Sequence, residues 1–162
     1  MIKRENTQTE WWRGEYTIST DAARIDFAAV HNFLRSSYWA QNIPAEVARR
    51  SIENSLCFGL YEAKRQIGFA RVVTDHATFA YLCDVFVVEE CRGRSLSKWL
   101  METILAHPEL QNLRRWLLAT ADAHELYRKF GFVALKAPSN FMERYAPDVY
   151  HSAEMKEKNY VD

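Results

Sequence analysis

The residues that most clearly suggest chemistry lie in the segment VFVVEECRGRSLSK, which runs from Val85 to Lys98. Its apolar half predicts a buried strand, and apolar residues at helical spacing begin at Leu96, after the basic half. The first backbone N–H groups of a helix lack partners within the helix, and the helix dipole places partial positive charge there. Because Arg92 and Arg94 add full positive charges at the same point, the segment predicts a cradle for a diphosphate group.

Two other interpretations of this segment stay open. It could be a solvated basic turn that only joins a strand to a helix. In addition, Gly93-Arg94-Ser95-Leu96-Ser97 half-matches the GxSxG elbow of serine hydrolases, although the second glycine is missing and the chain is short for that fold. The chain contains neither the GxxxxGK[ST] phosphate loop nor the GxGxxG fingerprint, so an ATP or NAD enzyme is not indicated.

A second segment, AHELYRKFGF at residues 123–132, places Tyr127 on a short helix that ends in Gly-Phe. From the residues alone, the simpler interpretation of Tyr127 is a core aromatic whose hydroxyl has a hydrogen-bond partner. His124 and Glu125 begin an HExxH pattern, but the second histidine is missing, so no metal site is predicted.

Taken together, the two segments resemble the GNAT superfamily of N-acetyltransferases. In that family a strand leads into an R-G-x-G-x-G/A loop that binds the pyrophosphate of acetyl-CoA. An A-x-x-x-Y-x-x-x-G-F segment later supplies a tyrosine near the CoA sulfur. The resemblance implies a GNAT-like acyl-CoA N-acyltransferase fold and an enzyme, an acyltransferase that uses acetyl-CoA as its cosubstrate and needs no metal.

The resemblance also implies a role for each matching residue. Backbone groups around Phe86 and Val87 would pair with the pantetheine arm, as an added strand pairs with a sheet edge. A primary amine of a small molecule or peptide would attack the thioester directly in a ternary complex, and Tyr127 would protonate the departing CoA thiolate. The residues that would hold the pyrophosphate are Arg92, Gly93, Arg94, Ser95, Leu96 and Ser97.

The sequence departs from the family pattern at three positions. Ser95 and Ser97 stand where small glycine or alanine residues are usual, and Thr120 stands where an asparagine is usual. Serine keeps the backbone donors and adds a hydroxyl, but its Cβ reduces clearance and makes a positive φ costly. We therefore expect CoA binding to persist at equal or lower affinity. The serines also motivate an alternative function, a CoA-binding sensor or interaction module without turnover.

Asp84 is an unusual residue because it lies inside the apolar run YLCDVFVV, a strand expected to be buried on both faces. An isolated buried carboxylate is costly and needs a partner. Asp84 is either a base or anchor for an ammonium substrate, or a structural group bonded to the backbone or to Arg71. Glu89 and Glu90 could serve the substrate similarly, but solvated acids near Arg92 are the simpler interpretation.

Three aromatic residues are candidates for the wall of an acceptor pocket. They are Tyr38, Trp39 and Phe141, and each could instead pack in the core. The identity of the acceptor does not follow from these residue types, because a pocket's shape depends on its geometry.

A mixed, mostly antiparallel sheet of the α/β (α+β) class, with helices on both faces, is expected to position these residues. We expect one domain over residues 1–162, with flexible ends near 1–12 and 151–162. Asp26 is expected to cap the first helix and Pro44 to begin the second, while Asp122 caps and Gly131 ends the last. The expected strands cover residues 15–20, 56–61, 67–73, 79–88, 115–120 and 132–135, with an edge at 140–144.

The overall composition limits the partners and the compartment. The chain of 162 residues has 21 basic and 21 acidic residues, so a general polyanion binder, and hence a nucleic-acid partner, is not predicted. No apolar run reaches the length of a membrane span or a signal peptide. The three cysteines form no CxxC pair, which favours a reducing cytoplasm. A homodimer would be consistent with the fold, in which subunit pairing is common.

Overall fold

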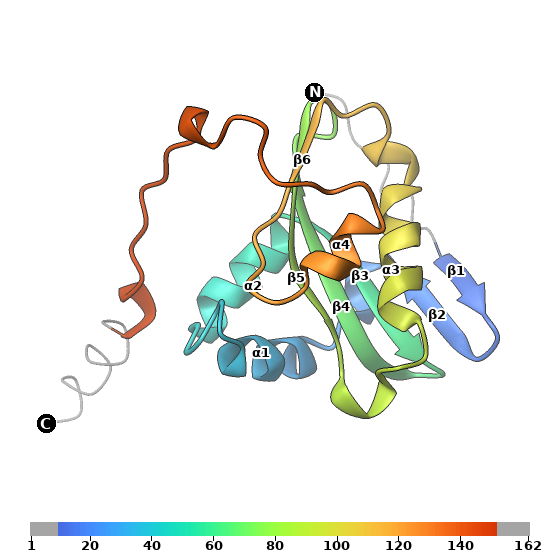
Figure 1. Ribbon diagram of the computed structural model, residues 1–162. Coiled ribbons are helices and arrows are strands. Elements are labelled where there is room, and N and C mark those ends of the chain that lie inside the picture. The colour runs from blue at the N-terminus through green and yellow to red at the C-terminus, as the bar shows by residue number, and fades with distance from the viewer. Residues whose placement is uncertain (1–9, 152–162) are drawn as a thin grey trace, which may run out of the picture.

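The computed structural model describes residues 10–151, which form a sheet of six strands that follow one another in chain order (Figure 1). Neighbouring strands are antiparallel, except for β5 and β6, which are parallel. The predicted mixed, mostly antiparallel sheet is therefore confirmed. The strands are β1 (Glu10–Arg13), β2 (Tyr16–Ser19), β3 (Leu56–Glu62), β4 (Arg65–Thr74), β5 (Phe79–Val87) and β6 (Arg115–Leu117). The helices are α1 (Phe27–Ser36), α2 (Ala45–Glu53), α3 (Leu96–Leu105) and α4 (His124–Arg128).

Helices cover both faces of the sheet, as predicted (Figure 1). Helix α3 packs over one face in a cluster with Phe58, and α1 and α2 pack over the other face in a cluster with Cys57. These two residues are adjacent in β3 and point in opposite directions, as consecutive strand residues do. Each face therefore has its own core. Helix α1 begins where predicted, because the Asp26 carboxylate accepts a hydrogen bond from the backbone N–H of Ala29 at 3.0 Å.

Strands β5 and β6 separate soon after they meet. Their pairing covers three residues of each strand and ends at Tyr81 and Leu117. Beyond Tyr81, no strand within residues 10–151 pairs with this edge of β5. The other edge of β5 carries a β-bulge opposite β4, in which Asp84 adopts a φ of 56°. In the second half of β5, the backbone groups that point away from β4 therefore face the gap and pair with no described strand.

The N-terminal part of the sheet is longer than expected. Residues 10–12, assigned to the flexible N-terminal end, belong to β1, which pairs with β2 through a turn at Gly14. The predicted strand at 15–20 is β2. His151, the first residue of the predicted flexible C-terminal end, is helical, and the remaining residues of the two ends, 1–9 and 152–162, lie outside the described residues.

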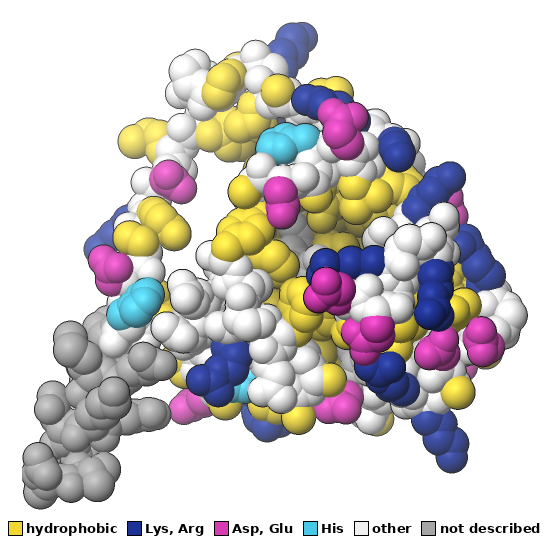
Figure 2. Space-filling model, turned by 60° about the horizontal axis from the view of Figure 1, so that its bottom comes forward, with side chains coloured by type: hydrophobic (Ala, Val, Ile, Leu, Met, Phe, Trp, Pro, Cys, Tyr) yellow, Lys and Arg dark blue, Asp and Glu magenta, His cyan; other side chains and the backbone are white. Residues whose placement is uncertain are grey.

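The expected strands at 132–135 and 140–144 are wrong. The chain from Phe132 to Lys136 has no regular structure, and Pro138–Asn140 is a 3-10 helix. The three-residue strand β6 offers little edge to pair with, and Pro138 lacks an N–H donor. Val133 is 85% exposed and Met142 is 99% exposed, so these apolar residues are not buried against the sheet. Figure 2 shows this C-terminal segment standing away from the body of the protein.

The buried ring of His107, which follows α3, is expected to make the folded protein less stable in mild acid. The ring is 3% exposed, Trp11 and Phe58 pack against it, and burial lowers its pKa from the ordinary value of 6.5. Its Nδ1 accepts a hydrogen bond from the Glu109 N–H at 3.2 Å, so the neutral ring fits the fold. The unfolded chain binds the proton on His107 more readily than the folded protein does. The stability that the buried neutral ring contributes is therefore complete above the ordinary pKa and is lost as pH falls below it.

We therefore expect the free energy of unfolding to fall between pH 7.5 and pH 5, and to fall less for His107→Phe. Urea unfolding at the two pH values measures the difference. Equal losses in the two proteins would assign the acid sensitivity to other groups.

Candidate functional site

The loop between β5 and α3 has the geometry of an anion site. It begins with a 3-10 turn at Glu89–Cys91 and reaches the N-terminus of α3 at Ser95, which makes no side-chain capping bond. The first N–H groups of α3 are therefore free of a side-chain cap. The Arg92 Nε donates to the Val87 carbonyl at 3.1 Å, which holds the loop against the end of β5. Gly93 has a φ of 78°, and no atom lies within 4 Å of the place where a Cβ would stand.

Not every residue of the predicted cradle is equally available. Arg94 donates to the Tyr16 hydroxyl at 3.0 Å and to the Glu62 carboxylate at 3.3 Å. Arg92 and the backbone N–H groups are thus the more available donors for a phosphate. Phe86 is buried, its ring stacks on that of Phe33 at 3.7 Å, and its backbone pairs with Phe69 of β4, with its carbonyl on the β4 side, so Phe86 itself is not available to a ligand.

Ser95 and Ser97, which depart from the family pattern in the same way, differ in conformation. Ser95 has a φ of 58° in the left-handed region, whereas Ser97 lies in the first turn of α3. The left-handed region destabilises a folded residue that has a Cβ by about 1–2 kcal/mol. Glycine avoids this strain, but it also stabilises the unfolded chain by about 0.4–1 kcal/mol through its greater conformational entropy. Glycine inside a helix is destabilising by about 0.5–1 kcal/mol.

We expect Ser95→Gly to raise the free energy of unfolding by about 0.5–1 kcal/mol and to tighten CoA binding. The matched Ser97→Gly variant is expected to lose stability. Urea unfolding and titration calorimetry with CoA provide the two measurements. A gain from Ser97→Gly that matches the gain from Ser95→Gly would mean that backbone strain is not the cause.

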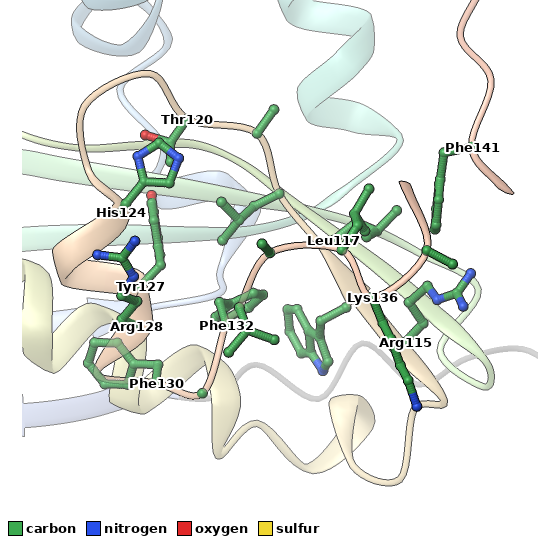
Figure 3. Close-up of a pocket in the computed structure, with 18 of the residues that line it drawn as sticks. Arg115, Leu117, Thr120, His124, Tyr127, Arg128, Phe130, Phe132, Lys136 and Phe141 are labelled. Carbon is green, nitrogen blue, oxygen red and sulfur yellow. The ribbon is translucent and has the colours of Figure 1, made fainter. Parts of the chain in front are cut away.

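Tyr127 lies in α4 and packs against the core cluster on the α3 face of the sheet. Burial raises the pKa of its phenol to about 12, and Tyr38, Asp122 and Cys83 act in the same direction. Cys83 belongs to β5 and Asp122 follows β6, so charged groups on both sides of the gap would influence the phenol. Figure 3 shows its hydroxyl directed toward Thr120 at one end of a cavity of about 1040 Å³. A neutral phenol in this position can donate a proton.

The loop between α1 and α2 connects the two sides of the gap. The Trp39 indole N–H donates to the Asp84 carboxylate at 3.1 Å, on the β5 side. The Tyr38 hydroxyl accepts from the Ala121 N–H at 3.0 Å and contacts the Asp122 carboxylate at 3.5 Å, on the β6 side. These two candidate acceptor residues therefore connect β5 to the segment that leads into α4, the helix that carries Tyr127. The third, Phe141, instead lines the cavity along β6.

Asp122 was expected to cap α4, and that prediction is wrong. Ala123 occupies the N-cap position without a capping side chain, and its backbone N–H donates to the Thr120 hydroxyl at 3.0 Å. Thr120, which stands where the family usually has an asparagine, thus helps to begin α4. The Asp122 side chain is directed to Tyr38 instead.

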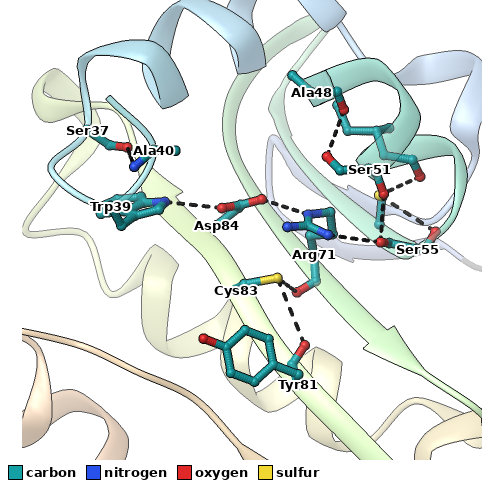
Figure 4. A network of polar contacts seen from close by, with 12 residues as sticks. Ser37, Trp39, Ala40, Ala48, Ser51, Ser55, Arg71, Tyr81, Cys83 and Asp84 are labelled. Carbon is teal, nitrogen blue, oxygen red and sulfur yellow. Dashed lines mark hydrogen bonds and ion pairs between the residues drawn. The ribbon is translucent and has the colours of Figure 1, made fainter. Parts of the chain in front are cut away.

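Asp84 is buried in an ion pair (Figure 4). Its Oδ2 accepts from the Arg71 Nε at 2.7 Å, while Arg71 also donates to the Ser55 hydroxyl at 3.1 Å. Burial acts most strongly and lowers the pKa of Arg71, but the charge and hydrogen bond of Asp84, together with Cys83 and Cys57, outweigh it and the net shift is upward. With Trp39 on Oδ1, both oxygens of the carboxylate have partners. Glu89 and Glu90 are exposed, and Glu90 pairs with Arg65.

Sequence reasoning identified Asp84 and Arg71 as a pair to consider, but it missed their link to Trp39 and Ser55. The signal for a link was the need of a buried carboxylate for several partners. Nothing in the spacing indicated which residues would supply them, because the loop and strands involved lie far apart in the sequence.

Comparison with known proteins identifies the family. A family model described as "Acetyltransferase (GNAT) domain" matches residues 53–134. The protein FG08082 of Gibberella zeae, which is named as an acetyltransferase, is 32% identical over 142 residues, which cover 74% of this chain and 79% of the relative. The chain therefore belongs to the GNAT family of acetyltransferases.

Solved structures agree with this assignment. A GNAT-family structure from Xanthomonas campestris is 49% identical, with a TM-score of 0.82, and the match covers 83% of this chain and 96% of that one. A protein from Clostridium acetobutylicum crystallised with acetyl-CoA shares the fold at 13% identity and a TM-score of 0.59, over 80% of this chain and 94% of that one.

Proposed function

We propose that the protein transfers the acetyl group of acetyl-CoA to a primary amine of a small molecule or peptide. The observation that carries this proposal is the position of Tyr127 at one end of the cavity beside β6, with its hydroxyl directed toward Thr120 and its proton held by burial. Family membership supports acyl transfer from acetyl-CoA, and the free backbone edge of β5 supports a pantetheine arm lying along it.

The chain's own residues suit the binding of acetyl-CoA. Of the predicted pair, Phe86 is bonded to β4, whereas the Val87 N–H points to the free edge of β5 and would pair with the pantetheine arm. The segment from Arg92 to Ser97 would hold the pyrophosphate through N–H groups at the start of α3 and the Arg92 guanidinium. The open surface over Gly93 leaves space for phosphate oxygens beside the backbone.

In the transfer step a neutral amine would attack the thioester carbon, so that a C–N bond forms and the C–S bond breaks. The Tyr127 hydroxyl would give its proton to the departing thiolate, and the proton released by the attacking nitrogen would return to the phenolate through water. Both Asp84 oxygens already accept hydrogen bonds, which supports a positioning role, through Trp39, over a role as the base.

An amine panel with acetyl-CoA tests the proposed function, with release of the free CoA thiol as the readout. We expect thiol release with at least one primary amine, together with acetyl-CoA binding in calorimetry. No release across the panel, alongside normal acetyl-CoA binding, would favour the alternative of a CoA-binding sensor module. The strained Ser95 is the observation that favours that alternative.

Other functions and partners have less support. The Ser95 hydroxyl makes no hydrogen bond within residues 10–151, so no base among them activates it for a serine hydrolase. No helix in the described part of the chain is long and apolar enough to cross a membrane. The expectations of a cytoplasmic location, of a homodimer and of no nucleic-acid, membrane or metal partner stay predictions.

A further inference from the structure

Two large aromatic side chains stand exposed beside the proposed reaction site. Tyr38 is 58% exposed and Trp39 is 42% exposed, and their rings meet edge to face, with centroids 5.0 Å apart and planes at 83°. We call this pair the aromatic corner. Neither residue lies in either core cluster, although the Trp39 ring contacts Phe33 with centroids 6.2 Å apart.

The aromatic corner is fixed from two sides. The indole N–H of Trp39 is bonded to Asp84, which Arg71 anchors from the far side (Figure 4). The hydroxyl of Tyr38 accepts the N–H of Ala121 in the segment that leads to α4. Side chains held in this way lose little entropy when a ligand binds to their faces. A hydrogen bond from the indole to a carboxylate also makes the ring face more electron-rich, which favours contact with a cation.

The charges around the aromatic corner favour the same kind of ligand. The exposed Asp122 carboxylate contacts the Tyr38 hydroxyl, and no Lys, Arg or His among residues 10–151 pairs with it. The Asp84 charge is balanced by Arg71, and on α4 Glu125 is balanced by Arg128. The uncompensated charge at the aromatic corner is therefore negative.

We propose that the aromatic corner and Asp122 bind a positively charged group of the acceptor that is not itself acetylated. The preferred acceptors are then diamines, or primary amines that carry a second cation. This inference rests on the proposed function.

The two nitrogen groups of the proposed acceptor need different protonation states, so they need different binding sites. The attacking amine must lose its proton, and an aromatic face or a carboxylate would stabilise the protonated form instead. The aromatic corner therefore suits the cation that stays charged, while the reacting amine lies near Tyr127. An amine that carries a carboxylate would be repelled by Asp122, and the nearby cations Arg71 and Arg128 are already paired.

Calorimetry with the CoA-bound protein tests the inference without requiring turnover. The probes are 1,4-diaminobutane, n-butylamine and 4-aminobutanoate, which share a chain length and differ in the second group. We expect the diamine to bind about tenfold more tightly than the monoamine, and the amino acid to bind most weakly. Trp39→Leu should reduce the diamine preference to within about twofold, and Asp122→Asn should reduce it severalfold.

Trp12→Leu is the matched control, because Trp12 is 67% exposed on β1 and has no part in the site. It should keep the full diamine preference. Trp39→Phe retains an aromatic face but loses the N–H bond to Asp84, so it should retain part of the preference. If Trp39→Leu fails to fold, Trp39→Phe and Asp122→Asn decide the question.

Equal binding of diamine and monoamine, or a preference unchanged in the Trp39 and Asp122 variants, would overturn the inference. The thiol assay separates this failure from failure of the proposed function. Thiol release with monoamines as efficient as with diamines would keep the function and reject the cation site. Diamine binding lost in Trp39→Leu, without thiol release from any amine, would keep the cation site and reject the function.

Discussion

Tyr127→Phe is expected to lower kcat by about 10²–10⁴-fold, the usual contribution of a positioned general acid. The Kd for acetyl-CoA should stay within about twofold, because the variant keeps the ring that packs edge to face on Phe132 and removes only the hydroxyl. Thiol-release kinetics and calorimetry with acetyl-CoA give the two quantities. A variant as active as the wild type would remove Tyr127 from the mechanism.

The pH dependence offers a second test of the same role. Because the pKa of Tyr127 is raised to about 12, its phenol keeps its proton at every pH in ordinary use. Any loss of activity on the alkaline side below that value must come from another group.

Tyr81→Phe is the matched control for Tyr127→Phe. Tyr81 is half-buried in the paired part of β5, so its substitution should leave kcat nearly unchanged.

Arg71→Met is expected to have the largest effect on stability, a loss of about 3 kcal/mol in the free energy of unfolding. The side chains of Arg71 and Asp84 are 16% and 7% exposed, so removal of the cation leaves a carboxylate in a largely dry environment. Trp39 would remain as the donor to that carboxylate, which places the loss at the lower end of the range for buried pairs. Urea unfolding measures the effect.

Two controls define what this loss means. Lys98→Met breaks an exposed i,i+4 pair with Glu102 and should cost no more than about 0.5 kcal/mol. The double variant Arg71→Met/Asp84→Asn removes both charges and should recover much of the loss. If Arg71→Met and Lys98→Met have similar effects, the ion pair is not shielded from water as the structure indicates.

The parts of the fold and site that the sequence predicted depend on short-range patterns. The strand, basic loop and helix from Val85 onward follow from period-two and period-3.6 hydrophobicity within a few turns of chain. The Asp26 cap is equally local, because the side chain bonds to a backbone group three residues later. The placement of Tyr127 beside the gap required the family resemblance, since periodicity alone could not distinguish a core aromatic.

The parts that could not be predicted depend on contacts between distant segments. Asp122 has the residue type of a helix cap. Its carboxylate nevertheless accepts from the Tyr38 hydroxyl across the gap and does not bond to an N–H of α4. The apolar pattern near Val133 is typical of a strand, yet a strand also needs an edge to pair with, and β6 provides three residues. The bond from Trp39 to Asp84 joins residues 45 positions apart, which no local pattern encodes.

The backbone of Asp84 restricts how this position can change over evolution. Its φ of 56° is readily adopted by glycine, asparagine and aspartate, and by few other residues. Of these three, glycine and asparagine would leave the Arg71 guanidinium without a counter-charge, while glutamate would restore the charge but strain the chain. Single substitutions are therefore expected to be rare here among descendants of this gene, and lineages that lose the aspartate should replace the arginine as well.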